Sequence, residues 1–355
     1  MYKKFINKSL RIFSISLAIT FIMGITPYLG FKFQSAGPYF TNPAPAADVL
    51  DKLKRKLEAK PNTFRLNKDL LGGRNLIPVA AAGVGYDQAK AFVLVNIENG
   101  EILASKNLSE VLKIASLTKI MTAAVALDLA DPEEQFIVSG QAASQVPTKV
   151  MLKAGEKYKL GELLKSLLIT SANDSAEVIK EGIDRKYGEG VFIKAMNHKA
   201  KFLGLKNTSF TNPQGYDSGN HYSSAEDLSI LSVYALKEYP LIAEIVSKDF
   251  EDLTKGGRDL RFYLNNWNGL LGVYPGVSGL KTGNTGQAGQ CTIVTAERAG
   301  KKLLAVLLGA PGVLQRDLWT AELLDLGFNK MADLPSVGVT ENMLKEKYAS
   351  WKYFE

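Results

Sequence analysis

A scarcity of cysteine and histidine narrows the chemistry open to this chain of 355 residues. Cys291 is the only cysteine, so neither an internal disulfide framework nor a cysteine metal site is available. We expect it to be a small buried residue of a strand. The two histidines, His198 and His221, stand in no recognisable nucleophile context, which argues against a Ser-His-Asp triad. We therefore expect a site without metal or cofactor.

Acidic residues are missing from the start of the chain, and this explains the formal net charge of +7. Residues 1–46 contain five basic and no acidic residues, and residues 47–74 contain eight basic and four acidic ones. Residues 75–355 are therefore left with a net charge of −2. Since the body of the protein is not basic, we expect no nucleic-acid partner.

Charge is also absent from residues 12–31, which follow Lys3, Lys4, Lys8 and Arg11. A basic start before an apolar run is typical of an export signal. The run is also long enough to span a bilayer, and the Ala-x-Ala sequence at residues 44–46 lies far from it, which favours an uncleaved anchor. We assign residues 1–33 to a signal peptide or N-terminal membrane anchor. The remainder is expected to be exported and to act at the extracytoplasmic face of the plasma membrane.

Residues 34–75 are predicted to be a linker that contains a basic helix. Val49, Leu53 and Leu57 recur at helical spacing beside the basic segment of residues 52–60. Both a solvated linker helix and a helix lying on an anionic membrane surface are compatible with this pattern.

The remaining chain predicts one sheet to which both ends contribute, with a helical lobe beside it. Short apolar segments bounded by turn residues predict strands at residues 91–98, 101–104, 279–285, 290–297 and 302–309. Helices are expected from residue 116 to 130, between residues 160 and 236 around a loop at 207–222, and from 315 to 326. This order indicates an α/β (α+β) fold in which helices flank an antiparallel sheet. We place a catalytic domain at residues 76–332. In the C-terminal tail, residues 333–355, Leu344, Tyr348 and Trp351 share a helical face, which favours a packed terminal helix over membrane contact.

Ser116 and Lys119 are the first candidate site. Ser116 stands where a helix N-cap is expected, but a capping box would place Glu or Gln where this chain has Lys119. A lysine in the first turn opposes the helix dipole, so local stability does not account for it. Residues three apart share a helix face, which gives a nucleophile with a general base beside it. The same spacing recurs at residues 278–281, but in a predicted strand, where such residues point to opposite faces.

Two further segments carry polar side chains suited to a site. Ser171 and Asn173 follow the helix expected at residues 161–170, where a hydroxyl relays a proton and a carboxamide binds an amide. A capping box of Asp174 and Glu177 is the alternative explanation of this polar turn. Lys281 and Thr282 lie on a predicted strand just before Gly283 and offer a fixed positive charge and a hydroxyl to a carboxylate. A glycine there suggests that a backbone or ligand approaches the strand closely.

Together, Ser116-x-x-Lys119, Ser171-x-Asn173 and Lys281-Thr282-Gly283 occur in this order on helix, turn and strand. The motif set is that of penicillin-binding proteins and class A β-lactamases. The sequence resembles the D-alanyl-D-alanine carboxypeptidases among the low-molecular-mass penicillin-binding proteins, from about residue 84 to 328. The likeness extends to residues 168–174, 196–197, 203–208, 212–215, 279–283 and 308–310.

The resemblance implies a serine transpeptidase/β-lactamase-like fold and an acyl-enzyme mechanism. Ser116 would attack the carbonyl between two terminal D-alanines, with Lys119 as the base that takes its proton. Lys119 must then be neutral, and partial burial near Lys281 pushes it in that direction. Ser171 would pass a proton to the leaving D-alanine, and Asn173 would hold the peptide stem.

By the same resemblance, Lys281 and Thr282 would bind the terminal carboxylate, with added charge from Arg316. The backbone N–H groups of Ser116 and Asn284 would form the oxyanion hole. The implied substrates are peptidoglycan stem peptides in the bacterial cell wall, and the implied covalent inhibitors are β-lactams.

Three alternatives stay open. An endopeptidase or transpeptidase of the same family differs only in the donor bond or the acceptor, which motifs do not separate. A β-lactamase is less expected, because Asp usually takes the middle of the S-x-N turn and a Glu-x-x-Leu-Asn element is not found after Asn173. A non-catalytic module that binds the cell wall is disfavoured because every motif position is filled.

Overall fold

The computed structural model describes residues 46–58, 62–67, 85–254 and 261–351. The expected signal or anchor at residues 1–33 lies outside them. Among the helices in these ranges, none is both long enough and apolar enough to cross a bilayer.

A five-stranded antiparallel sheet, in the order β2-β1-β9-β8-β7, forms the centre of the fold. The expected contribution of both chain ends is confirmed, because β1 pairs with β9 from Ala91↔Leu308 to Asn96↔Leu303. The strands are β1 (Ala91–Asn96), β2 (Ile102–Lys106), β7 (Val277–Thr285), β8 (Gly289–Arg298) and β9 (Lys301–Ala310). Cys291 is fully buried on β8, as expected.

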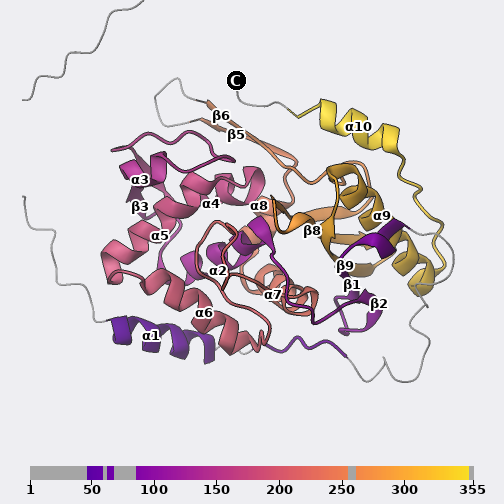
Figure 1. Cartoon of the computed structure of the whole chain (residues 1–355), viewed down its shortest axis with the longest axis horizontal. Coiled ribbons are helices and arrows are strands. Elements are labelled where there is room, and N and C mark those ends of the chain that lie inside the picture. The colour runs from indigo at the N-terminus through magenta and orange to yellow at the C-terminus, as the bar shows by residue number, and fades with distance from the viewer. Residues whose placement is uncertain (1–45, 59–61, 68–84, 255–260, 352–355) are drawn as a thin grey trace, which may run out of the picture. The chain divides into compact units, whose positions relative to one another are not determined.

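Both faces of the sheet are covered. Successive side chains point to opposite faces, and because the strands are apolar throughout, each face has to be buried by other elements. On one face, Phe92 and Leu94 pack in a cluster with residues of α9 (Val313–Ala332). On the other, Val93 and Val95 join the larger core with α2 (Lys119–Leu129) and α7 (Ala225–Glu238). Figure 1 shows the sheet between α9 on one side and α2, α7 and the helical lobe on the other.

The helical lobe adds short elements around α2 and α5. Its helices are α3 (Gly140–Ala143), α4 (Leu160–Lys165), a π-helix (Ser166–Thr170), α5 (Asn173–Tyr187), α6 (Val191–Leu203) and α8 (Pro240–Val246). Two antiparallel pairs complete it, β3 (Gln135–Ile137) with β4 (Lys157–Lys159), and β5 (Phe250–Thr254) with β6 (Arg261–Asn265). The 3₁₀ turns are η2 (Gly85–Gln88) and η3 (Ala115–Thr118).

The basic helix expected in the linker is present as α1 (Ala46–Glu58). However, it is neither a solvated linker helix nor exposed for membrane contact. Val49, Leu53 and Leu57 are at most 5% exposed and belong to the main core, and α1 packs on α6. Its apolar face is therefore available neither to solvent nor to a membrane.

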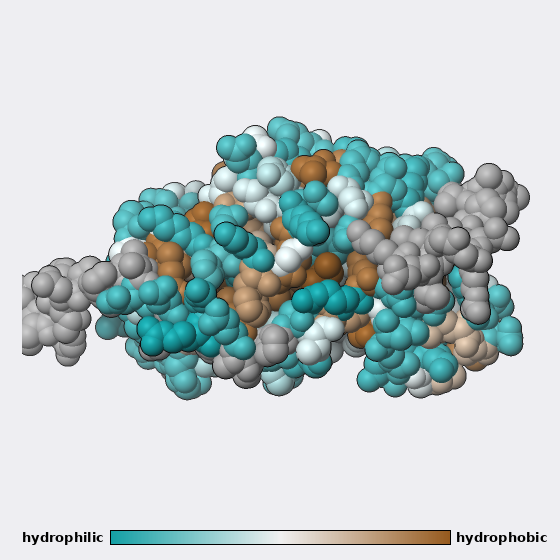
Figure 2. Space-filling model, turned by 90° about the horizontal axis from the view of Figure 1, so that it is seen from below, coloured by the Kyte–Doolittle hydropathy of each residue, from teal (hydrophilic) through white to brown (hydrophobic). Residues whose placement is uncertain are grey.

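Figure 2 shows the molecule from below, relative to the view of Figure 1. This face is largely hydrophilic, with separate apolar patches.

The C-terminal tail forms α10 (Glu341–Ala349), and the expected packed terminal helix is confirmed. Leu344 is fully buried in the cluster that contains α9, and Tyr348 packs against the same cluster. The side chain of Thr340 caps the helix by accepting a hydrogen bond from the N–H of Met343.

Candidate active site

Ser116 lies in the middle of η3, and not at a helix N-cap as expected. Ile114 precedes this turn, and α2 begins only at Lys119. Two distant glycines allow the turn to be enclosed by backbone. A Cβ on Gly215 would lie 2.0 Å from the carbonyl oxygen of Ala115, and a Cβ on Gly283 would lie 2.8 Å from the amide nitrogen of Ser116. The close approach that Gly283 suggested in the sequence is therefore the packing of β7 on the serine turn.

The amine of Lys119 lies directly against the serine hydroxyl, as the shared face predicted. Its Nζ is 2.8 Å from Oγ of Ser116, 2.8 Å from Oδ1 of Asn173 and 2.7 Å from the carbonyl oxygen of Gln214. The side chain is wholly buried, where only partial burial was expected. Burial, and then the positive charge of Lys281, hold the pKa of Lys119 well below its usual value, although the carboxylate of Asp174 acts in the opposite direction.

The turn at residues 171–173 also contacts Lys119, through Asn173. Ser171 follows the π-helix with a left-handed φ of 68°, and Asn173 begins α5. Besides its contact with Lys119, Asn173 donates from Nδ2 to the carbonyl oxygen of Val146 at 3.0 Å. Since an amide oxygen accepts two hydrogen bonds and an amide nitrogen donates two, each atom keeps one further capacity for a ligand.

The capping box of Asp174 and Glu177, the alternative explanation of this polar turn, is not formed: α5 begins at Asn173 and has no side-chain cap. Asp174 instead accepts hydrogen bonds from the N–H groups of Val150 and Leu152, and so fixes the loop that borders the serine. The carboxylate of Glu177 accepts a hydrogen bond from the side chain of Gln214. Tertiary partners have replaced the local cap at both acidic residues.

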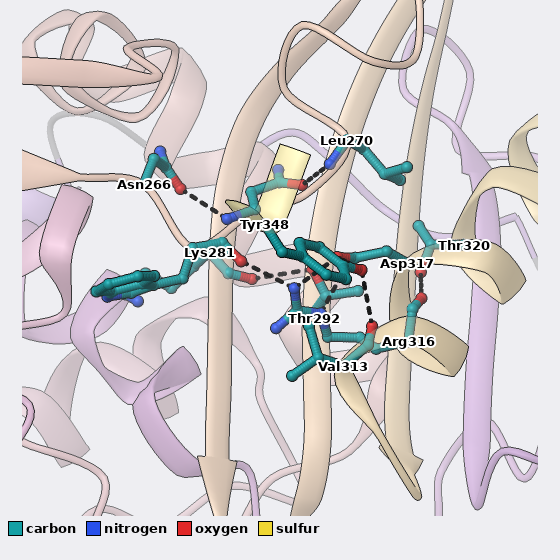
Figure 3. Close-up of polar contacts among 11 residues, drawn as sticks. Asn266, Leu270, Lys281, Thr292, Val313, Arg316, Asp317, Thr320 and Tyr348 are labelled. Atoms are coloured by element: carbon teal, nitrogen blue, oxygen red, sulfur yellow. Dashed lines mark hydrogen bonds and ion pairs between the residues drawn. The ribbon is translucent and has the colours of Figure 1, made fainter. Parts of the chain in front are cut away.

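Lys281, Thr282 and Arg316 meet at the edge formed by β7 and α9. Lys281 is 2% exposed and donates from Nζ to the carbonyl oxygen of Thr282 at 2.9 Å. Burial, and then the charge of Arg316, lower the pKa of Lys281 to about 7. Arg316 forms a bidentate ion pair with Asp317 at 2.7 and 2.8 Å (Figure 3). It also donates to the carbonyl oxygen of Trp267 at 2.8 Å.

A cleft of about 660 Å³ opens over these groups, between the helical lobe and the sheet. Five of the eight predicted site residues line it: Ser116, Ser171, Thr282, Asn284 and Arg316. Lys119, Asn173 and Lys281 are not among the residues that line it and are themselves buried, so they act on the cleft through their neighbours or through single atoms.

A larger cavity of about 1110 Å³, lined among others by Phe64, Ile97, Leu236 and Lys302, contains none of the predicted site residues. Volume therefore does not identify the site, whereas the contact between a hydroxyl and a buried amine does.

The sequence did not indicate three residues that the structure places at the candidate site. Gln214 supplies a carbonyl oxygen to Lys119, and its segment 212–215 was noted only as part of the family likeness. Trp267 and Trp351 both line the cleft, although Trp351 was predicted only to belong to a packed helix. A contact between residues so far apart in the sequence leaves no local signal.

Comparison with known proteins identifies the family of this chain. Residues 80–312 match the model of the Peptidase S11 family, described as D-alanyl-D-alanine carboxypeptidase. The D-alanyl-D-alanine carboxypeptidase DacF of Bacillus subtilis is 36% identical over 270 residues, which are 75% of this chain and 68% of that protein. The chain belongs to the D-alanyl-D-alanine carboxypeptidase family.

Other members of this carboxypeptidase family are similar over a comparable region. DacA of Haemophilus influenzae is 30% identical, and the match covers 68% of this chain but only 62% of that protein, less than two thirds of its length. The structure of Penicillin-Binding Protein D2 of Listeria monocytogenes with cefotaxime bound is 33% identical, with a TM-score of 0.60, and covers 70% of this chain and 98% of that one. The Streptomyces K15 DD-transpeptidase is 26% identical, with a TM-score of 0.63, and covers 68% and 97%.

The carboxypeptidase family, the antiparallel α/β fold and the class of enzyme, a serine-type peptidase, are therefore confirmed as the sequence predicted. Peptidoglycan as substrate and β-lactams as ligands follow for the family. Members of the family generally act outside the cytoplasm.

Proposed function

We propose that this protein removes the terminal D-alanine from peptidoglycan pentapeptide stems, with Ser116 as the nucleophile. The observation that carries the proposal is the 2.8 Å contact between Oγ of Ser116 and Nζ of Lys119 beneath an open cleft. Ser116 attacks the carbonyl between the two D-alanines, the peptide bond breaks, and an acyl-enzyme forms. Water then hydrolyses the ester and restores the hydroxyl.

The three neighbours of Lys119 determine the direction of the lone pair on its amine nitrogen. A neutral amine has two N–H groups and one lone pair, so one of the three neighbours has to be a donor. The carbonyl oxygen of Gln214 only accepts, and Oδ1 of Asn173 only accepts because Nδ2 of the same amide faces the carbonyl oxygen of Val146. The hydroxyl of Ser116 is the remaining donor, so neutral Lys119 directs its lone pair at the proton to be removed.

Ser171 is proposed to return this proton to the leaving nitrogen, since its side chain lines the same cleft as Ser116. Asn173 is proposed to position Lys119 and to bind the stem peptide with its remaining capacity. The N–H groups of Ser116 and Asn284 are proposed as the oxyanion hole, because Gly283 brings β7 against the serine turn.

The terminal carboxylate is proposed to bind near Thr282, Lys281 and Arg316. Two cations stand there against one anion, Asp317, which leaves an excess of positive charge in a buried setting. A carboxylate completes that balance and favours the charged form of Lys281, whose pKa is lowered to about 7 by burial and by Arg316.

The proposal is tested by incubating the protein with a muropeptide that carries a pentapeptide stem and analysing the products by mass spectrometry. Loss of one D-alanine by the wild type, but not by Ser116→Ala, is expected. An intact pentapeptide contradicts the proposal.

A second candidate is transfer to an amine acceptor, since a structural relative is named a DD-transpeptidase. The same assay with an added D-amino acid separates the two activities. Exchange of the terminal residue in preference to its loss favours transpeptidation.

For the N-terminus, we propose that residues 12–31 direct export and hold the protein at the outer face of the plasma membrane. The support is the uncharged run after four basic residues. Cell fractionation with N-terminal sequencing tests this: a membrane-bound chain that retains the run is expected, and a cytoplasmic one contradicts it.

A further inference from the structure

The C-terminal tail reaches the cleft and is fixed there by contacts on two sides. Leu344 is fully buried in the cluster with α9. On the other side, the amine of Lys347 lies 2.5 Å from the carboxylate of Asp249, just before β5. With α10 held at both places, the residues that end the helix lie beside Arg316.

Tyr348 connects the tail to the arginine of the cleft. Its hydroxyl donates to Oδ2 of Asp317 at 2.9 Å, the carboxylate oxygen that also accepts from Arg316 (Figure 3). A Cβ on Gly269 would lie 2.3 Å from Oδ2 of Asp317 and 2.7 Å from the ring of Tyr348, so the segment after Trp267 packs closely on this pair. The tail is thus part of the network that orients Arg316.

Trp351 extends this contact into the cleft. Its ring meets that of Trp267 edge to face, with centroids 5.2 Å apart, and lies 4.8 Å from the ring of Tyr348. Both indoles line the cleft. Nε1 of Trp351 has no hydrogen-bond partner within the described part of the chain.

Trp267 locates this aromatic pair within the cleft. Its Nε1 donates at 2.8 Å to the carbonyl oxygen of Thr170, the residue before Ser171, and its own carbonyl oxygen accepts from Arg316 at 2.8 Å. Under the proposed function, Ser171 protonates the leaving nitrogen and Arg316 lies near the terminal carboxylate. The residue between these two points is the leaving one, and the two indoles stand beside it.

We propose that Trp351, which follows the end of α10, forms with Trp267 the wall of the subsite for the leaving C-terminal residue and sets the size of the side chain accepted there. The inference rests on the proposed function and adds a specificity-determining residue to it. The ring of Trp351 leaves room for a small side chain such as the methyl group of D-alanine, and a branched side chain meets the indole.

The test uses two peptides with the same acyl part, Nα,Nε-diacetyl-lysyl-D-alanine, followed by D-alanine or by D-leucine. Because both give the same acyl-enzyme, the ratio of their kcat/KM values reports the leaving-residue subsite alone. Trp351→Ala removes the wall, Trp351→Phe shortens it, and Met343→Ala is a control on the outer side of α10, where Met343 is 38% exposed.

We expect the D-leucine to D-alanine ratio to rise by about tenfold or more in Trp351→Ala, since a single extra methylene in an apolar pocket already discriminates by ~10–200-fold. Trp351→Phe is expected to lie between the wild type and Trp351→Ala, and Met343→Ala to equal the wild type. A ratio that is the same in all four proteins, even with both rates reduced, assigns the tail a structural role only and overturns the inference. Failure of the wild type to release D-alanine from the first peptide contradicts the proposed function itself.

Discussion

Replacing Lys119 by methionine separates chemistry from packing in the proposed site. Methionine fills the buried volume but removes the amine, so Ser116 loses its contact with the only hydrogen-bond partner that Oγ has among the described residues. A general base is worth ~10²–10⁴-fold, and we expect acylation by a fluorescent penicillin to slow by that factor. The assay is the second-order rate constant of labelling, followed by gel fluorescence.

The same substitution also has a stability cost that the assay must take into account. Oδ1 of Asn173 and the carbonyl oxygen of Gln214 each lose a donor, and an unsatisfied buried acceptor costs about 1–3 kcal/mol. For two acceptors, the loss is about 2–6 kcal/mol of the free energy of unfolding. The measured loss should be smaller, because the variant no longer pays the cost of burying an amine. Denaturant unfolding of each variant measures this loss independently of acylation.

Lys199 offers a matched control, because it too is fully buried. Its amine pairs with Asp128 at 2.7 Å, and neither residue is among those that line the active-site cleft. Lys199→Met leaves a buried carboxylate without this partner, which costs about 3–5 kcal/mol, yet the folded fraction should acylate at the wild-type rate. Equal acylation by wild type and Lys119→Met would refute the base assignment, and equal slowing in both methionine variants would refute the reasoning from geometry.

Two predictions concern pH. Lys281→Ala removes a charge that lowers the pKa of Lys119, so the acid limb of the acylation profile should move to higher pH, because the amine must be neutral to act; an unmoved limb contradicts this. Burial, and then the charge of Lys113, lower the pKa of His221 from 6.5 to about 4. Below pH 6.5, the unfolded chain therefore binds a proton that the native protein does not bind until the pH approaches 4. Between pH 6.5 and 4, this should remove about 3 kcal/mol of stability from the wild type and not from His221→Gln. An equal loss of stability in both proteins, measured by denaturant unfolding at the two pH values, contradicts it.

The hydrogen bonds of His221 are consistent with one neutral tautomer. The hydroxyl of Thr118 donates to the carbonyl oxygen of Ala115, so it accepts from Nε2–H of His221 at 2.7 Å. Nδ1 accepts from the N–H of Thr211 at 3.1 Å. A second proton on Nδ1 would break that last bond, which agrees with the direction of the pKa change.

The sheet and the positions of the motifs were predictable because local pattern carries them. Apolar segments bounded by glycine turns predict β7, β8 and β9. The two strands near the N-terminus and these three near the C-terminus are each too few for a buried sheet, so they are expected to join in one. The spacing of Ser116 and Lys119 predicted their contact, since neighbours three apart meet on a helical turn, whether 3₁₀ or α.

What the sequence did not reveal depends on distant partners. Ser116 is not an N-cap, because it lies within a 3₁₀ turn, which the backbones at Gly215 and Gly283 enclose. Asp174 does not cap α5, because the helix already begins at Asn173, and the carboxylate of Asp174 instead binds the loop at residues 150–152. In each case, a tertiary contact displaced the local rule from which the expectation was drawn.

The tail shows the same limit at a larger scale. The helical spacing of Leu344, Tyr348 and Trp351 predicted a packed face, but not that its last residue would line the cleft. Nor did the pattern around residues 49–57 indicate that α6 would cover it. Amphipathic spacing identifies a face to be buried and leaves the burying partner undefined.

The proposed mechanism requires that penicillin acylates Ser116. Its most direct test is mass spectrometry of the penicillin-treated protein after proteolysis, which locates the covalent adduct. We predict an adduct on the peptide that contains Ser116 and none in Ser116→Ala. An adduct on Ser171 or elsewhere, or undiminished labelling of Ser116→Ala, would contradict the mechanism.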